Sequence, residues 1–239
     1  AASREPGDRE TLDALDRAAA GAQRVEDALA LLTTLAQAPG GRVTAPVAAS
    51  RLLASTGRIE KAVEMVGRAL AVVADDPGAL AQQASIFADA GDLERLEPAV
   101  GRLEAVAPNG AETLYYGATL AFMSQQADKA IRLAQRAVAT DPRHARAHNL
   151  LGAALASLGR VDEARQAFQT SLELNPKDAT PYINLGSLER LNAANPSAAV
   201  GHFTEALALD PGSAAARDGL IRALEATGNH ARAARLRAR

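Results

Sequence analysis

Apolar residues recur along this chain with the spacing of helices rather than strands. Leu151 and Leu155 stand four residues apart, as do Phe168 and Leu172, and this spacing places both members of a pair on one helix face. No Val- and Ile-rich run is long enough for a buried parallel strand. No apolar run approaches the roughly 18 residues of a membrane-spanning helix. The pattern therefore predicts an all-α chain without a membrane span.

Two adjacent stretches of the C-terminal half share one pattern. They are Ala145–Asp178 and Ala179–Gly212. Each holds a Leu-Gly pair, then an Ala followed four residues later by a Phe, and then a closing Pro. In chain order these residues are Leu151-Gly152, Ala164, Phe168 and Pro176, and then Leu185-Gly186, Ala199, Phe203 and Pro211. A pattern that returns at a fixed interval of this length indicates a repeat protein.

The pattern resembles the tetratricopeptide repeat, a 34-residue unit with Leu-Gly in its first helix, Ala-x3-Phe in its second and a closing Pro. Steps of this length place the repeat starts at Arg9, Val43, Pro77, Ala111, Ala145, Ala179 and, after one inserted residue, Ala214. The match is strongest from residue 111 onward. The resemblance implies an all-α, right-handed superhelical solenoid of about six to seven stacked antiparallel helix pairs. Helix A of each repeat would line a concave groove, and helix B would lie behind it.

The register also divides the chain. Residues 1–8 precede the first repeat and are expected to form a flexible tail. Residues 9–76 hold two degenerate repeats, and residues 77–213 hold four repeats that would form the main groove. Residues 214–239 are expected to form a partial repeat with a capping helix.

Small residues stand where helices of one hairpin must approach closely. Gly152 on helix A is expected to meet Ala164 on helix B, because a close crossing requires small side chains. The turn between helices A and B needs a left-handed backbone, which glycine adopts readily. Glycines stand there in four repeats, at Gly57, Gly91, Gly159 and Gly228, and Gln125 departs from this pattern.

Residues that begin helices support the same register. Asp76 followed by Pro77 is predicted to be an N-cap with a first-turn proline. Asp178 and Ser213 stand at the equivalent position of later repeats. These residues mark helix starts that agree with the repeat boundaries.

Composition and charge narrow the range of functions. The 239 residues include 26 Lys and Arg against 28 Asp and Glu, and about a quarter are Ala, the strongest helix former. This balance does not favour a nucleic-acid binder, and four arginines at the C-terminal end form only a weak basic patch. No cysteine is present, so disulfides and thiolate chemistry are excluded. The chain starts at Ala1, from which we expect that an upstream segment was removed and that the protein is cytoplasmic or, if that segment was a signal or anchor, periplasmic or exported.

No motif for catalysis, a cofactor or a metal stands out. The sequence lacks a P-loop, a G-x-G-x-x-G, a G-x-S-x-G and an H-E-x-x-H. His144 and His148 have the spacing of two metal ligands on one helix face, but no carboxylate completes a set. We therefore predict a non-catalytic chain without a cofactor or metal.

Helix A residues that packing does not use are the candidates for binding a partner. In this register they are Tyr115, Thr119, Phe122, Arg146, Asn149, Thr180, Ile183, Ser187, Arg190, Asp218 and Arg222. Tyr115, Thr119 and Phe122 share one helix face, and aromatic residues beside Arg and Asn are typical of binding hot spots. The alternative is that Tyr115 and Phe122 pack on the neighbouring helix.

The predicted partner is another protein or a peptide segment, held in the groove by a non-catalytic adaptor that assembles a complex. Some members of the family bind acidic tails through a clamp of Lys, Asn and Arg, but no helix A holds a lysine here and Ala153 replaces a clamp asparagine. Two alternatives remain open. The repeats could belong to a larger enzyme or a membrane-anchored or exported protein, or the chain could form homo-oligomers through exposed apolar residues such as Leu29, Leu32 and Leu35.

Overall fold

The computed structural model describes residues 22–37, 43–191 and 195–238, and every regular element in these ranges is an α-helix. The tail expected at residues 1–8 and the first repeat start, Arg9, lie outside the described residues. The chain forms two compact units, Ala1–Ser124 and Gln125–Arg239. Among the described residues, no helix is both long and apolar enough to cross a membrane.

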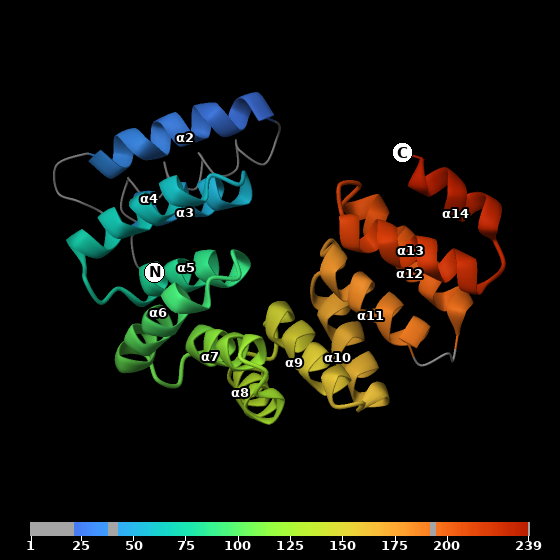
Figure 1. Cartoon of the computed structure of the whole chain (residues 1–239). Coiled ribbons are helices and arrows are strands. Elements are labelled where there is room, and N and C mark those ends of the chain that lie inside the picture. Colours follow the sequence, from blue (N-terminus) through green and yellow to red (C-terminus); the bar gives the residue numbers. More distant parts are fainter. Residues whose placement is uncertain (1–21, 38–42, 192–194, 239) are drawn as a thin grey trace. The chain divides into compact units, whose positions relative to one another are not determined.

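The first unit stacks its helices in chain order, as the blue-to-green segments of Figure 1 show. They are α2 (Ala22–Gln37), α3 (Thr44–Ser55), α4 (Ile59–Val72), α5 (Pro77–Asp89), α6 (Leu93–Val106) and α7 (Ala111–Met123).

The second unit continues the same alternation of helices. It holds α8 (Ala127–Thr140), α9 (Ala145–Ser157), α10 (Val161–Leu174), α11 (Ala179–Leu191), α12 (Pro196–Leu209), α13 (Ala214–Ala226) and α14 (His230–Arg237). From Val43 onward, each helix A and helix B of the predicted register is a separate helix.

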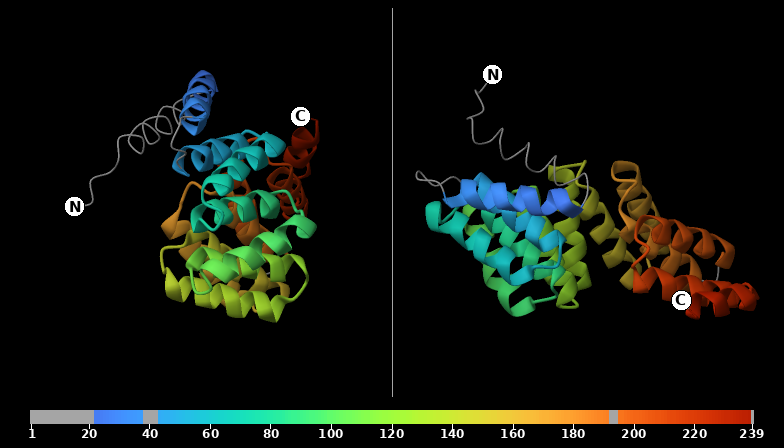
Figure 2. Two further views of the ribbon diagram at one scale, coloured as in Figure 1. Left: turned by 90° about the vertical axis from the view of Figure 1, so that its left-hand side faces the viewer. Right: turned by 90° about the horizontal axis from the view of Figure 1, so that it is seen from above.

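Helices A and B play different parts within each unit. Consecutive A helices contact each other, as α3 with α5, α5 with α7, α9 with α11 and α11 with α13. In the described part of the chain, consecutive B helices within a unit make no comparable contact. The A helices therefore form an inner row and the B helices a more widely spaced outer row. The views of Figure 2 show the stacked hairpins of each unit from two further directions.

The hairpins of the second unit pack a glycine against a phenylalanine. A Cβ placed on Gly152 would lie 2.6 Å from the Phe168 ring and 3.1 Å from the carbonyl oxygen of Ala164, so the predicted approach of Gly152 to Ala164 is confirmed. A Cβ on Gly186 would lie 2.9 Å from the Phe203 ring, and one on Gly219 of the following A helix would lie 2.3 Å from it. Phe203 is thus enclosed by both neighbouring A helices and is 1% exposed.

The turns and caps follow the sequence prediction. Four turn glycines have positive φ angles, namely Gly57, Gly91, Gly159 and Gly228. Gln125, where the sequence departs from glycine, still adopts φ 61°. Asp76 caps α5 by accepting from the amide of Ala79, and Ser213 caps α13 by accepting from that of Ala216. The register therefore determines where helices end even where the preferred residue is missing.

The apolar residues expected to be exposed on the N-terminal repeats are covered instead. Leu29 and Leu32 of α2 are 6% and 0% exposed, and Leu35 is half-buried. The expectation that Leu29 and Leu32 offer a surface to another copy is therefore wrong. The physical reason is that α2 packs on α3 and places this face toward the core.

Candidate partner-binding surface

The three candidate residues of the first unit lie on α7 but differ in exposure. Tyr115 is 7% exposed and makes an edge-to-face contact with Tyr116, with 4.9 Å between the ring centroids. Thr119 is half-buried and donates a hydrogen bond to the Tyr115 carbonyl oxygen over 2.9 Å. Phe122 is half-buried. Tyr115 is therefore mostly buried and offers a partner little area.

In the second unit, one candidate residue, Asn149, is bonded to a residue outside the candidate set, Asn184. Asn184 of α11 donates from Nδ2 to Oδ1 of Asn149 on α9 over 2.9 Å. This bond links two A helices across the inner row. Both side chains are only half-buried, and each makes no other hydrogen bond with the described residues. The amide nitrogen of Asn149 and the amide oxygen of Asn184 thus retain capacity for an external backbone group.

The rest of α11 provides apolar and polar groups along the same row. Ile183 is half-buried and packs against the core cluster around Phe203. Thr180 is exposed, and its backbone amide donates to Asp178 over 2.8 Å. Ser187 is half-buried. These side chains alternate with the core positions of the helix, so binding a ligand would not require the core to open.

Charged residues give this surface a positive balance. The candidate set of the second unit holds Arg146, Arg190 and Arg222 against Asp218. Arg222 pairs with Asp218 over 2.8 Å, and both side chains are exposed. The Nε of Arg190 is buried and finds no hydrogen-bond partner among the described residues, which is costly for a charged group.

One polar cluster of the second unit was missed by the sequence prediction. Arg165 of α10 donates from Nε to Glu189 of α11 over 2.8 Å, and the Glu189 side chain is 9% exposed. The bond to Glu189 raises the pKa of Arg165. His202 of α12 lies near the same carboxylate, and partial burial lowers its pKa while the charge of Glu189 opposes that shift. The sequence did contain one signal for this cluster. Glu189 is charged, whereas the equivalent position one repeat earlier holds the apolar Leu155.

The two histidines considered as metal ligands have structural roles. His144 caps α9 by accepting from the amide of Ala147 over 3.2 Å. The Nε2 of His148 lies 3.1 Å from the carbonyl oxygen of Pro142. Across the described ranges, no group of three or more His, Cys, Asp or Glu residues is placed to hold a metal ion.

Comparison with known proteins agrees with this geometry. A family model described as tetratricopeptide repeat matches residues 117–179 and 186–237. These two ranges consist of tetratricopeptide repeats. The matched ranges include α8, α9, α10, α12, α13 and α14. No curated protein matches the sequence of this tetratricopeptide repeat chain.

Solved structures extend the likeness to the N-terminal repeats. A tetratricopeptide repeat protein from Parabacteroides merdae aligns with 93% of this chain and 86% of its own, with a TM-score of 0.73 and 15% identity. A TPR protein of Thermus thermophilus aligns with 77% of this chain and 99% of its own, with a TM-score of 0.66 and 21% identity. The APC/C hetero-tetramer Cut9-Hcn1 aligns with 92% of this chain at a TM-score of 0.75 and 18% identity, and this chain spans 46% of that one. At these identities the likeness shows a shared all-α helical-repeat fold, which is consistent with a protein–protein interaction module.

Proposed function

We propose that this chain is a non-catalytic adaptor whose second unit binds a segment of a partner protein along its inner row. The observation that carries the proposal is the Asn149–Asn184 bond, which positions two amide groups on adjacent A helices without satisfying all of their polar atoms. Amide side chains held in this way suit the backbone of an extended segment, which presents both donors and acceptors.

Neighbouring residues indicate which segment would fit. The half-buried Ile183 offers an apolar contact, and the arginines at positions 146 and 190 favour acidic side chains. A partner segment with acidic residues around an apolar anchor would use both features. Binding of this kind would let the chain act as a scaffold in the assembly of a complex.

The test is quantitative co-purification of tagged chain from its native source, followed by mass spectrometry. The inner-row variant carries Arg146→Glu and Ser187→Glu, which reverse or add charge at positions outside the core. The matched control carries Arg132→Glu on α8 and Gln169→Glu on α10, both exposed on the outer row.

We expect at least one protein to be captured by the wild-type chain and by the control, and to be depleted about tenfold or more by the inner-row variant. Circular dichroism should show equal helicity for all three proteins. Capture that is equal for the two variants would refute binding at the inner row.

A further inference from the structure

The side-chain amide of Gln82 on α5 is largely buried in the first unit and has no internal partner. Gln82 is 8% exposed, and its amide makes no hydrogen bond with the described residues. Neither of its polar atoms is fully enclosed, so the amide reaches the surface. Most buried amides in folded proteins are hydrogen-bonded, because an unpaired one loses the bonds that it would make in water. This side chain therefore needs an explanation.

The second unit shows how the same position of the repeat is satisfied elsewhere. Gln82 and Asn184 occupy the same position, three repeats apart. Asn184 donates to Asn149 of the preceding A helix over 2.9 Å. In the repeat that precedes Gln82, the position of Asn149 is held by Val47 of α3. Because a valine side chain has no polar atom, it cannot make the equivalent hydrogen bond.

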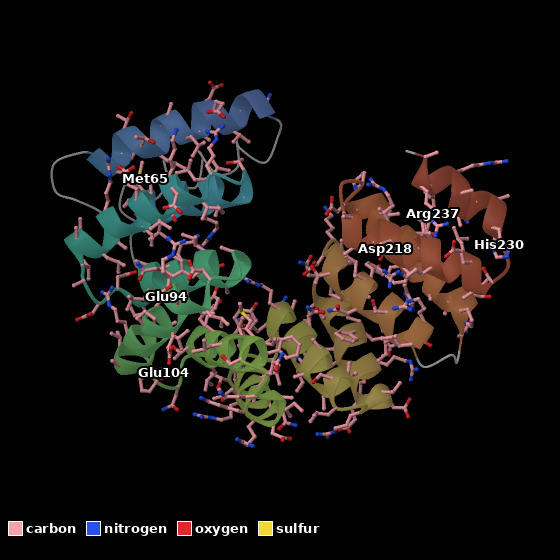
Figure 3. The ribbon with its side chains drawn as sticks, viewed as in Figure 1. Met65, Glu94, Glu104, Asp218, His230 and Arg237 are labelled. Carbon is pink, nitrogen blue, oxygen red and sulfur yellow. The ribbon has the colours of Figure 1, made fainter. Side chains whose placement is uncertain are left out.

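The amide of Gln82 belongs to a pair of A helices with apolar residues at the neighbouring positions. α3 packs on α5. Their B helices are α4 and α6, on which Figure 3 labels Met65 and Glu94. The inner-row positions beside Gln82 hold Val47 and Ala81, and both residues are half-buried. These positions therefore combine one polar amide with small apolar contacts and contain no charged side chain.

An extended peptide backbone has the groups that this amide lacks. In an extended chain the N–H and C=O groups of one residue point to the same side, as they do in an antiparallel pair of strands. The oxygen of a glutamine amide can accept from that N–H while its nitrogen donates to that C=O. A helical segment uses these groups internally, and a charged ligand would find no opposite charge at these positions. The chemistry therefore favours an extended segment.

We propose that Gln82 binds the backbone of an extended segment of a partner protein, with small apolar side chains of that segment on Val47 and Ala81. Binding supplies the two hydrogen bonds that Val47 cannot provide. The site lies on the inner row of the first unit. It goes beyond the function proposed above, which concerns the second unit, and it does not depend on the Asn149–Asn184 bond.

A peptide titration followed by NMR tests this site directly. The full ¹⁵N-labelled chain is titrated with the capped tripeptide acetyl-Thr-Val-Thr-methylamide, whose β-branched residues favour an extended backbone. We expect a saturable shift of the Gln82 side-chain amide and none of that of Gln135, which is exposed on α8. The same tripeptide with N-methylated peptide bonds has no N–H donors and should not saturate the site.

One variant removes the amide and retains the length of the side chain. Gln82→Met should raise the half-saturating tripeptide concentration about tenfold or more, as followed through the backbone amide of Ala81. It should also unfold at a higher temperature than the wild type, because it leaves no buried amide unpaired. Gln135→Met is the matched control and should bind the tripeptide as the wild type does. Circular dichroism establishes that both variants are folded.

The proposal is overturned if the Gln82 signal does not shift up to the solubility limit of the tripeptide. It is also overturned if the N-methylated tripeptide saturates the site equally, or if Gln82→Met binds with wild-type affinity. A shift confined to the side chains of Asn149 and Asn184 would overturn it as well, and would support binding at the second unit instead. The two proposals therefore fail separately.

Discussion

The two units place their larger side chains on different helices where helix A and helix B of a hairpin cross. In the second unit, Gly152 and Gly186 on the A helices receive Phe168 and Phe203 from the B helices. In the first unit, the equivalent A-helix positions hold the larger residues Ser50 and Ala84, and the equivalent B-helix positions hold the smaller Val66 and Val100. All of these B-helix side chains are at most 2% exposed. The repeat thus constrains the combined volume at the crossing rather than either residue.

Ser50 of the first unit stands at the repeat position that glycine occupies in the second unit. Its hydroxyl donates to the carbonyl oxygen of Ala62 over 2.8 Å in the buried crossing. The equivalent carbonyl, that of Ala164, would lie 3.1 Å from a Cβ on Gly152. A serine is tolerated because it turns a close approach to a carbonyl into a hydrogen bond.

The largest expected effect comes from removing the large side chain of the second unit. Phe168→Ala should lower the free energy of unfolding by about 4 kcal/mol, because the cavity faces a glycine that cannot fill it. Val66→Ala in the first unit should cost about 2 kcal/mol, since less volume is lost. Urea denaturation of both variants measures the difference, and equal losses would contradict the comparison.

A smaller effect is expected from enlarging the glycine. Gly152→Ala should cost about 2 kcal/mol net, because a Cβ that lies 2.6 Å from the Phe168 ring outweighs a gain in helix propensity of about 1 kcal/mol. The double variant Gly152→Ala with Phe168→Val recreates the Ala84–Val100 pair and should be more stable than additivity predicts. A double-mutant cycle measures this coupling. Strict additivity would show that the two positions do not share one volume.

A substitution in the turn between α7 and α8 is expected to stabilise the protein. Gln125 adopts φ 61°, where four other repeats use glycine. Gln125→Gly should raise the free energy of unfolding by about 0.5–1 kcal/mol, because glycine removes the strain of the left-handed backbone. Gly159→Gln, which makes the reverse change, should lower it by a similar amount. Thermal unfolding of the pair checks the prediction, and shifts of the same sign would count against it.

The smallest effect concerns pH and the polar cluster of the second unit. Burial lowers the pKa of His202, so the unfolded chain binds more protons in the window just below the ordinary histidine pKa of about 6.5. Stability should therefore fall slightly as the pH drops through this window. His202→Gln should reduce that pH dependence, whereas His230→Gln at an exposed position should not. Denaturation midpoints at pH 7.5 and pH 5.5 provide the measurement, and an unchanged slope in His202→Gln would exclude this source.

Much of the fold could be predicted because repeats carry local signals in sequence. The spacing of Leu-Gly, Ala-x3-Phe and Pro predicts alternating helices, and the described helices follow it from Val43 onward. Turn glycines and N-caps act within a few residues of themselves, so Gly159 and Asp76 could be assigned without a tertiary structure. The candidate binding residues were harder to predict, because the position of a residue in the repeat does not show whether other side chains bury it.

The sequence by itself determined the helix boundaries, the turns and the Gly-to-Phe pairing in the two hairpins between Ala145 and Gly212, because these depend on neighbours along the chain or one hairpin away. Only the tertiary structure decided that Tyr115, Leu29 and Leu32 are buried and that Glu189 has Arg165 as its partner. These outcomes depend on side chains from successive repeats meeting across the stack, and the 34-residue pattern does not specify the identities of those side chains.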